Sequence, residues 1–178
     1  MNDQKSRFDV IGQLGSLRRY ARSLAGNDHD AEDLVQDALL RAYEKQASFR
    51  PGSNLRTWLF SVLHNTFIDG FRSRRAEMRR NAQSALTAET VQQPAQEHSV
   101  RLDQIRRAFL TLPEEQRGAL HLVAIEGLTY EEAAAILGIP IGTLMSRVSR
   151  ARASMRAMEE VEPVIGKGKL RIVGGSDD

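Results

Sequence analysis

The stretch TYEEAAAILGIPIGTLMSRVSRAR, from Thr129 to Arg152, constrains the fold most. It begins with acidic residues, becomes apolar, is interrupted by Gly138 and Pro140, and ends with basic residues. Thr129 and Glu132 have the spacing of a capping box, in which each side chain accepts from the other's backbone N–H at a helix start. Glycine adopts the left-handed conformation that ends many helices, and proline fixes the start of the next. The stretch therefore predicts two short helices around one tight turn.

The second of these helices has an apolar stripe and a polar face. Helical spacing predicts a buried stripe of Leu144, Val148, Ala151 and Met155. The other face carries Thr143, Ser146, Arg147 and Arg150. This is the plan of a helix-turn-helix, whose second helix enters the major groove and reads bases through groups such as Arg and Ser. An ordinary hairpin with a solvated basic face is the alternative, but the cap, the glycine break and the polar second helix occur together and favour DNA binding.

The distribution of charge also favours a polyanionic partner. The net charge of the 178 residues is only +2. However, residues 71–80 contain five Arg and one Glu, and residues 146–156 contain four Arg and no acidic residue. Two solvated helix faces would also account for these clusters. Two separate basic patches on a nearly neutral chain nevertheless indicate a polyanion bound at two places.

Composition narrows the class of protein. Hydrophobic residues are 41% of the chain and aromatic residues only 6%, so the core should consist mainly of Leu, Ile, Val and Ala, which suits helices. There is no Cys, which excludes disulfides and thiolate zinc sites. The N-terminal residues lack the apolar segment of a signal peptide, and no apolar stretch is long enough to cross a membrane. We expect a soluble, cytoplasmic protein.

No enzyme or metal motif is found. The segment NDHDAED resembles a metal cluster in composition, but its acidic residues lie at a predicted helix start, where the helix dipole explains them. There is no HExxH pattern, no glycine-rich phosphate loop and no nucleophile elbow. We therefore expect neither catalysis nor a metal nor another cofactor.

Hydrophobic spacing predicts two small all-helical domains joined by a flexible linker. In residues 1–80, after a break at GNDHD (26–30), one predicted buried stripe consists of Ala31, Leu34, Val35, Ala38, Leu39, Ala42 and Tyr43. A later helix begins near Leu55, with Trp58 in its apolar stripe. Residues 81–100 are polar without a stripe and are interpreted as the linker. Residues 101–158 form the predicted helix-turn-helix domain, and residues 159–178 a flexible tail.

Two segments resemble the extracytoplasmic-function (ECF) class of bacterial sigma factors in the sigma-70 family. LPEEQRGALHLVAIEGLTYEEAAAILGIPIGTLMSRVSRAR is similar to their C-terminal promoter-binding domain. DAEDLVQDALLRAYEKQASFRPGSNLRTWLFSVLHNTFID is similar to their N-terminal domain. The resemblance implies a subunit that recruits core RNA polymerase to promoters and helps to melt them, in a stress or signal response. It also implies regulation by an anti-sigma factor.

The resemblance assigns roles to particular residues. Those implied to bind core polymerase are Asp33, Gln36, Asp37 and Arg41, which from their spacing alone would be a solvated face. Those implied to act at the minus-ten element are Phe49, Asn54 and Asn65, with Asn65 where the family holds a flipped base. Phosphate contacts are expected of Arg72, Arg74 and Arg75. The resemblance also implies that the minus-thirty-five element is read by one face of the last helix, which holds Thr143, Ser146, Arg147, Ser149 and Arg150.

Two other functions remain open on the sequence. A sigma-like interaction module could sequester an anti-sigma factor without starting transcription, but it would not need the Arg147 and Arg150 face or Asn65. A simple helix-turn-helix repressor would leave the N-terminal domain without a function. The sigma factor is therefore the preferred interpretation.

Overall fold

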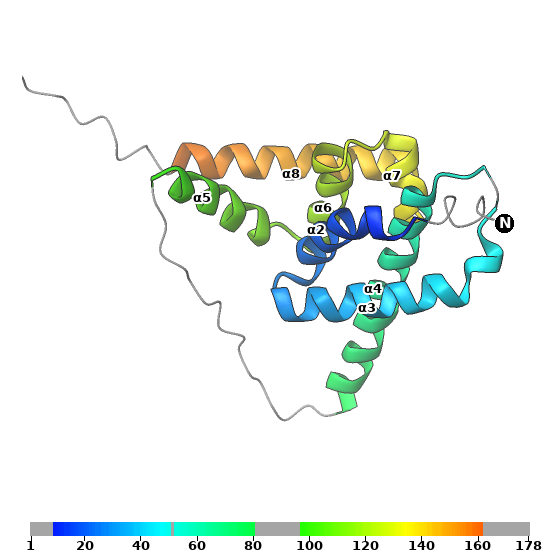
Figure 1. The fold of residues 1–178 in the computed structure, drawn as a ribbon. Helices are drawn as coiled ribbons and strands as arrows, with labels where there is room; N and C mark the ends of the chain where they lie inside the picture. The colour runs from blue at the N-terminus through cyan, green and yellow to red at the C-terminus, as the bar shows by residue number, and fades with distance from the viewer. Residues whose placement is uncertain (1–8, 51, 81–96, 162–178) are drawn as a thin grey trace, which may run out of the picture.

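The computed structural model describes residues 9–50, 52–80 and 97–161, and these residues form helices with no strand among them. In chain order the elements are η1 (Ile11–Gln13), α2 (Leu14–Ala25), α3 (Asp28–Glu44), η2 (Gln46–Ser48), α4 (Leu55–Arg80), α5 (Glu97–Thr111), α6 (Glu114–Leu120), η3 (His121–Ile125), α7 (Tyr130–Leu137) and α8 (Ile141–Val161). The label η3 marks a π-helical turn. The predicted all-α fold is confirmed (Figure 1). Within the described ranges, no helix has the length and apolar composition of a membrane-spanning segment.

The N-terminal half, residues 9–80, is built on α2, α3 and α4, which pack against one another. Gly26 ends α2 in the left-handed conformation, with a φ of 81°. Asn27 then caps α3, because its side-chain oxygen accepts from the backbone N–H of Asp30 at 2.8 Å. The break predicted at residues 26–30 is therefore a tight turn between two helices. The wholly buried residues of this half include Tyr20, Phe60 and Leu63.

Tyr43 does not belong to the buried stripe of α3, and that prediction is wrong. Its side chain is 76% exposed, whereas Ala31, Val35 and Ala42 are buried. At 3.6 residues per turn, Tyr43 lies about 120° around the helix from Ala31, outside the sector that faces the core. Trp58 packs against the core, as expected.

The C-terminal half, residues 97–161, contains the predicted helix-turn-helix in α7 and α8. Glu132 N–H donates to Thr129 Oγ1 at 3.2 Å, and Thr129 N–H donates to Glu132 Oε2 at 3.0 Å, which completes the capping box. Gly138 ends α7 with a φ of 62°, and α8 begins directly after Pro140. The apolar stripe of α8 is confirmed as buried at Leu144, Val148 and Ala151, with Met155 partly buried against the core.

The ends of this half differ from the sequence-based boundaries. The helix α5 begins at Glu97, inside the segment 81–100 that was expected to be linker, and α8 extends to Val161. Residues 81–96 and 162–178 lie outside the described part of the chain. The helix α5 packs on α8 (Figure 1).

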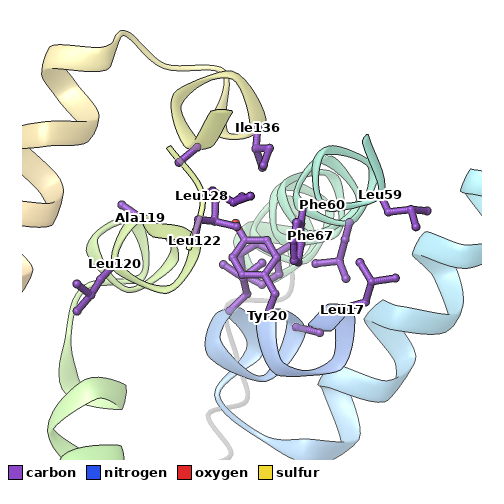
Figure 2. Packing of buried hydrophobic residues seen from close by; sticks show 14 of the residues in the cluster. Leu17, Tyr20, Leu59, Phe60, Phe67, Ala119, Leu120, Leu122, Leu128 and Ile136 are labelled. Carbon is purple, nitrogen blue, oxygen red and sulfur yellow. The ribbon is translucent and has the colours of Figure 1, made fainter. Parts of the chain in front are cut away.

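The two halves pack on each other and share one core. The helix α2 contacts α6, and α4 contacts α7. Tyr20 lies at the centre, with its ring 5.4 Å edge-on from Phe60 of its own half and 5.3 Å from His121 of the other. Figure 2 shows the residues of the C-terminal half that complete this core, including Leu122, Leu128 and Ile136.

Candidate nucleic-acid interface

The exposed face of α8 carries a polar cluster. Ser146, Ser149 and Arg150 are exposed, whereas Thr143 is half-buried. Arg150 Nη2 donates to Ser146 Oγ at 2.7 Å, so these two side chains form one polar group on the surface. Hydroxyl and guanidinium groups on a protruding helix are suited to contact base edges and phosphates.

Arg147 does not lie on this exposed face. Its side chain is only 19% exposed, and Nη2 lies 2.7 Å from Oε2 of Glu115 on α6. Its charge also reaches the N-terminal half. Burial first, and then the charge of Arg147, lower the pKa of His64 on α4 to about 4. Arg147 therefore ties α8 to its surroundings, which differs from the expectation of a freely exposed side chain.

A shallow hollow that includes Ser149 adds basic residues that the sequence analysis did not assign to the DNA-reading face. It lies between α7 and α8, and its lining includes Tyr130, Ser149, Arg152 and Arg156. Arg152 and Arg156 belong to the second basic cluster, but their position beside Ser149 becomes apparent only once α8 is packed against α7.

The residues expected at the minus-ten element lie in the loop before α4, at Phe49 and Asn54, and along α4 itself. Asn54 caps this helix, because its Oδ1 accepts from the backbone N–H groups of Arg56 at 3.0 Å and Thr57 at 3.3 Å. The ring of Phe49 lies 5.3 Å from that of Trp58, which fixes the preceding loop against α4.

Asn65 lies farther along α4 and is exposed. Eleven residues separate it from Asn54, which corresponds to about 16 Å along a helix axis. The structure therefore does not bring Asn54 and Asn65 together at one point. Arg72, Arg74 and Arg75 follow on α4, but their side chains lie outside the described part of the chain.

The residues expected to bind polymerase share the outer surface of α3. Asp33, Gln36 and Asp37 are exposed. Arg41 is half-buried and pairs with Asp69 of α4 at 2.7 Å, so it also fixes α3 against its neighbour. The same surface includes two apolar side chains that the sequence reasoning did not assign to it, Leu40 and Tyr43, which are 64% and 76% exposed.

The contact between the two halves contains a buried carboxylate that sequence reasoning missed. The side chain of Glu126 is 0% exposed and is held by Arg19 and Arg56 of the N-terminal half and by His121 beside it. Burial alone would raise the pKa of Glu126, but hydrogen bonds from His121, Arg56 and Arg19 lower it to about 2. Glu126 is therefore ionised at neutral pH.

A second polar contact joins the two halves at the end of α2. Arg117 of α6 donates from Nη2 to the backbone oxygen of Leu24 at 2.9 Å and from Nε to that of Ser23. These carbonyl groups belong to the last turn of α2, where the helix has unsatisfied acceptors and partial negative charge. Among the described residues, no cluster of His, Asp or Glu side chains could hold a metal ion.

Comparisons with known proteins place both halves in one family. The family model described as Sigma-70 region 2 matches residues 13–77, and that described as Sigma-70, region 4 matches residues 102–155. The ECF RNA polymerase sigma factor EcfG of Rhodopseudomonas palustris is 44% identical over 156 residues, which cover 88% of this chain and 86% of that protein.

Solved structures agree. The sigma factor RpoE of Bartonella quintana, in complex with the anti-sigma factor NepR, has a TM-score of 0.77 and 39% identity, over 92% of this chain and 100% of that one. The anti-anti-sigma factor PhyR from Bartonella quintana shares only the fold, with a TM-score of 0.52 and 18% identity over 83% of this chain and 49% of that one. On the family matches and the identity to EcfG, the chain belongs to the ECF class of sigma-70 family sigma factors.

Proposed function

We propose that the chain binds core RNA polymerase and directs promoter-specific transcription initiation, without being an enzyme itself. The observation that carries this proposal is the complete helix-turn-helix with the exposed Ser146–Arg150 pair on α8, in a chain of the ECF class. Because its partners would be the polymerase and the chromosome, its site of action would be the cytoplasm.

The N-terminal half would provide the polymerase contact. The outer surface of α3 combines the carboxylates of Asp33 and Asp37 with the exposed apolar side chains of Leu40 and Tyr43. Exposed aromatic and apolar side chains surrounded by polar groups are typical of a protein interface, whose apolar centre has a polar rim. Gln36 lies on the same surface, and Arg41 would contribute by holding α3 to α4.

The two DNA contacts would lie on different helices. The loop before α4, with Phe49 and Asn54, and the middle of α4, with Asn65, would act at the minus-ten element. The exposed face of α8, with Ser146, Ser149 and Arg150, would read the minus-thirty-five element. In this proposal Asn54 acts mainly as the helix cap that fixes the loop, and Asn65 is the exposed amide available to an unstacked base.

Regulation by an anti-sigma factor is part of the proposal. It is supported by the similarity to RpoE, which was solved bound to the anti-sigma factor NepR. A stress or signal response would then begin with release from such a partner.

The test is reconstitution. The purified chain is mixed with purified core polymerase, and complex formation and promoter-dependent transcripts are measured. A stable complex with specific transcripts is the expected result. A chain that binds an anti-sigma factor but neither core polymerase nor DNA would instead be an interaction module, and the proposal would be wrong.

A further inference from the structure

Two arginines of the N-terminal half converge on one anion. Arg19 of α2 donates to the Glu126 carboxylate from Nε, at 3.2 Å from Oε1. Arg56 of α4 donates from Nη2 to Oε2 and also to the backbone oxygen of Glu126, at 3.0 Å from the latter. The carboxylate is fully buried, whereas the side chains of Arg19 and Arg56 are 54% and 33% exposed. The carboxylate is therefore the buried group, and the two partly exposed arginines form its binding site.

The N-terminal half positions both arginines by contacts of its own. The guanidinium carbon of Arg56 lies 5.5 Å from the centre of the Phe60 ring, one turn further along α4, in a cation–π contact. Arg19 Nη2 donates to Ser16 Oγ at 3.0 Å, within α2. Neither contact involves the C-terminal half. The arginine pair is therefore prearranged, and it would keep its geometry if the two halves separated.

The position of this pair suggests its other ligand. Arg56 follows Asn54 in the first turn of α4, next to the loop proposed for the minus-ten element. A guanidinium group binds carboxylates and phosphates with the same planar array of donors. A DNA backbone that follows the start of α4 would present phosphates to this pair.

We propose that Arg19 and Arg56 form a binding site for a backbone phosphate of promoter DNA, and that Glu126 fills this site when the two halves are packed together. The proposal rests on the proposed function as a promoter-binding protein. It has a structural consequence, since one site cannot hold Glu126 and a phosphate together. DNA binding at α4 and packing of the C-terminal half on the N-terminal half would then compete.

The test compares Glu126→Gln with Glu131→Gln in the full-length chain. Glu131 is exposed on α7, so its substitution removes the same charge without touching the contact. Because the sequence contains no cysteine, cysteines introduced at the exposed residues Ala47 and Ala153 can carry a dye pair that reports the separation of the halves by energy transfer. Affinity is measured by anisotropy with a short labelled duplex of mixed sequence over a range of salt concentrations.

Glu126→Gln should lower energy transfer and tighten DNA binding, and the salt dependence should become steeper by about one unit of slope for each arginine released. The double variant Arg19→Ala/Arg56→Ala should also lower energy transfer but should weaken DNA binding. A shared site therefore predicts that both variants lower energy transfer but change DNA affinity in opposite directions. Glu131→Gln should change neither quantity. Circular dichroism checks that helix content is retained, and the arginine variant supplies an independent test if Glu126→Gln does not fold.

Two results would overturn the inference. If Glu126→Gln lowers energy transfer without changing DNA affinity or its salt dependence, the arginines do not bind phosphate. If it leaves energy transfer unchanged, Glu126 does not control the packing of the halves. Transcription by the wild-type chain with core polymerase separates these failures from failure of the proposed function. Transcripts from the wild type, together with either result, leave that function standing and remove only the shared site.

Discussion

Alanine substitutions at Arg147 and Arg150 should have different effects, although both residues lie on α8. Arg150 is exposed, and its hydrogen-bond partner within the described residues is Ser146 of its own helix, at 2.7 Å from the hydroxyl. Arg147 is 19% exposed and pairs with Glu115 at 2.7 Å. We therefore expect Arg150→Ala to affect DNA recognition and Arg147→Ala to affect mainly stability.

The structure sets the expected sizes of both effects. Loss of a bidentate contact from Arg150 to guanine should cost about 1–3 kcal/mol at a single base pair, or roughly 5- to 150-fold in affinity. The pair of Arg147 and Glu115 is screened, because Glu115 is 68% exposed, so its loss should cost at most about 1 kcal/mol. The buried stem of Arg147 adds a similar contribution from packing. Together these should lower the melting temperature by roughly 4–8 °C for a chain of this size.

The assay is binding of polymerase holoenzyme to a panel of promoter variants with single-base changes, together with thermal unfolding of the free chain. Leu144→Ala is the control for stability, since Leu144 is 0% exposed and its truncation should cost about 2–5 kcal/mol without relaxing preference at any base pair. If Arg147→Ala relaxes preference at one base pair while Arg150→Ala does not, the reasoning from exposure is wrong. The arginine that reads DNA would then have to leave Glu115 on binding.

Three other outcomes are expected. Charge reversal at Asp33 and Asp37, both exposed on α3, should weaken core polymerase binding in a pull-down while circular dichroism remains unchanged. If the variant retains as much core polymerase as the wild type, this surface of α3 is not part of the interface. Asn65→Ala should slow promoter melting, as measured by permanganate reactivity, without weakening binding to the minus-thirty-five element; melting at the wild-type rate would mean that Asn65 does not hold an unstacked base. The pKa of Glu126 is lowered from 4.5 to about 2, so its contribution to stability is present above 4.5 and is lost as pH falls toward 2. The difference in free energy of unfolding between wild type and Glu126→Gln should therefore shrink by about 3 kcal/mol between neutral pH and pH 2, and a pH-independent difference would contradict the assigned ionisation.

The parts of the fold that depend on neighbouring residues could be predicted from the sequence. The capping box of Thr129 and Glu132, the left-handed Gly138 and the buried stripe of α8 all follow from spacings of a few residues. A closer use of the same spacing would also have placed Arg147 at the edge of that stripe, because it lies only about 60° around the helix from Leu144. The partial burial of Arg147 could therefore have been predicted from helical spacing.

The contact between the halves could not be predicted in this way. Arg19 and Glu126 are separated by 107 residues, and Arg56 and Glu126 by 70. In sequence, Glu126 is one of several acids near the start of α7, and nothing in the local pattern distinguishes it from the exposed Glu131. The two basic patches recognised in the sequence, residues 71–80 and 146–156, include neither Arg19 nor Arg56. The burial of Glu126 follows only from the tertiary structure, in which α4 packs on α7.

The chemistry of this contact is suited to a joint that opens. An apolar contact stabilises packing through burial alone. Separating it would expose apolar surface to water, at a free-energy cost of about 25 cal/mol per Å². A buried ion pair stabilises packing less, because each ion loses hydration that it recovers on separation. The contact combines both kinds, with Tyr20 and Leu122 at its centre and Glu126 and Arg117 beside them. Replacing Glu126 and its two arginines by apolar residues could hold the halves together more firmly, but it would remove the charges that DNA can bind. Under the shared-site proposal, the ion pairs therefore limit the strength of packing and leave a cationic surface available when the halves part.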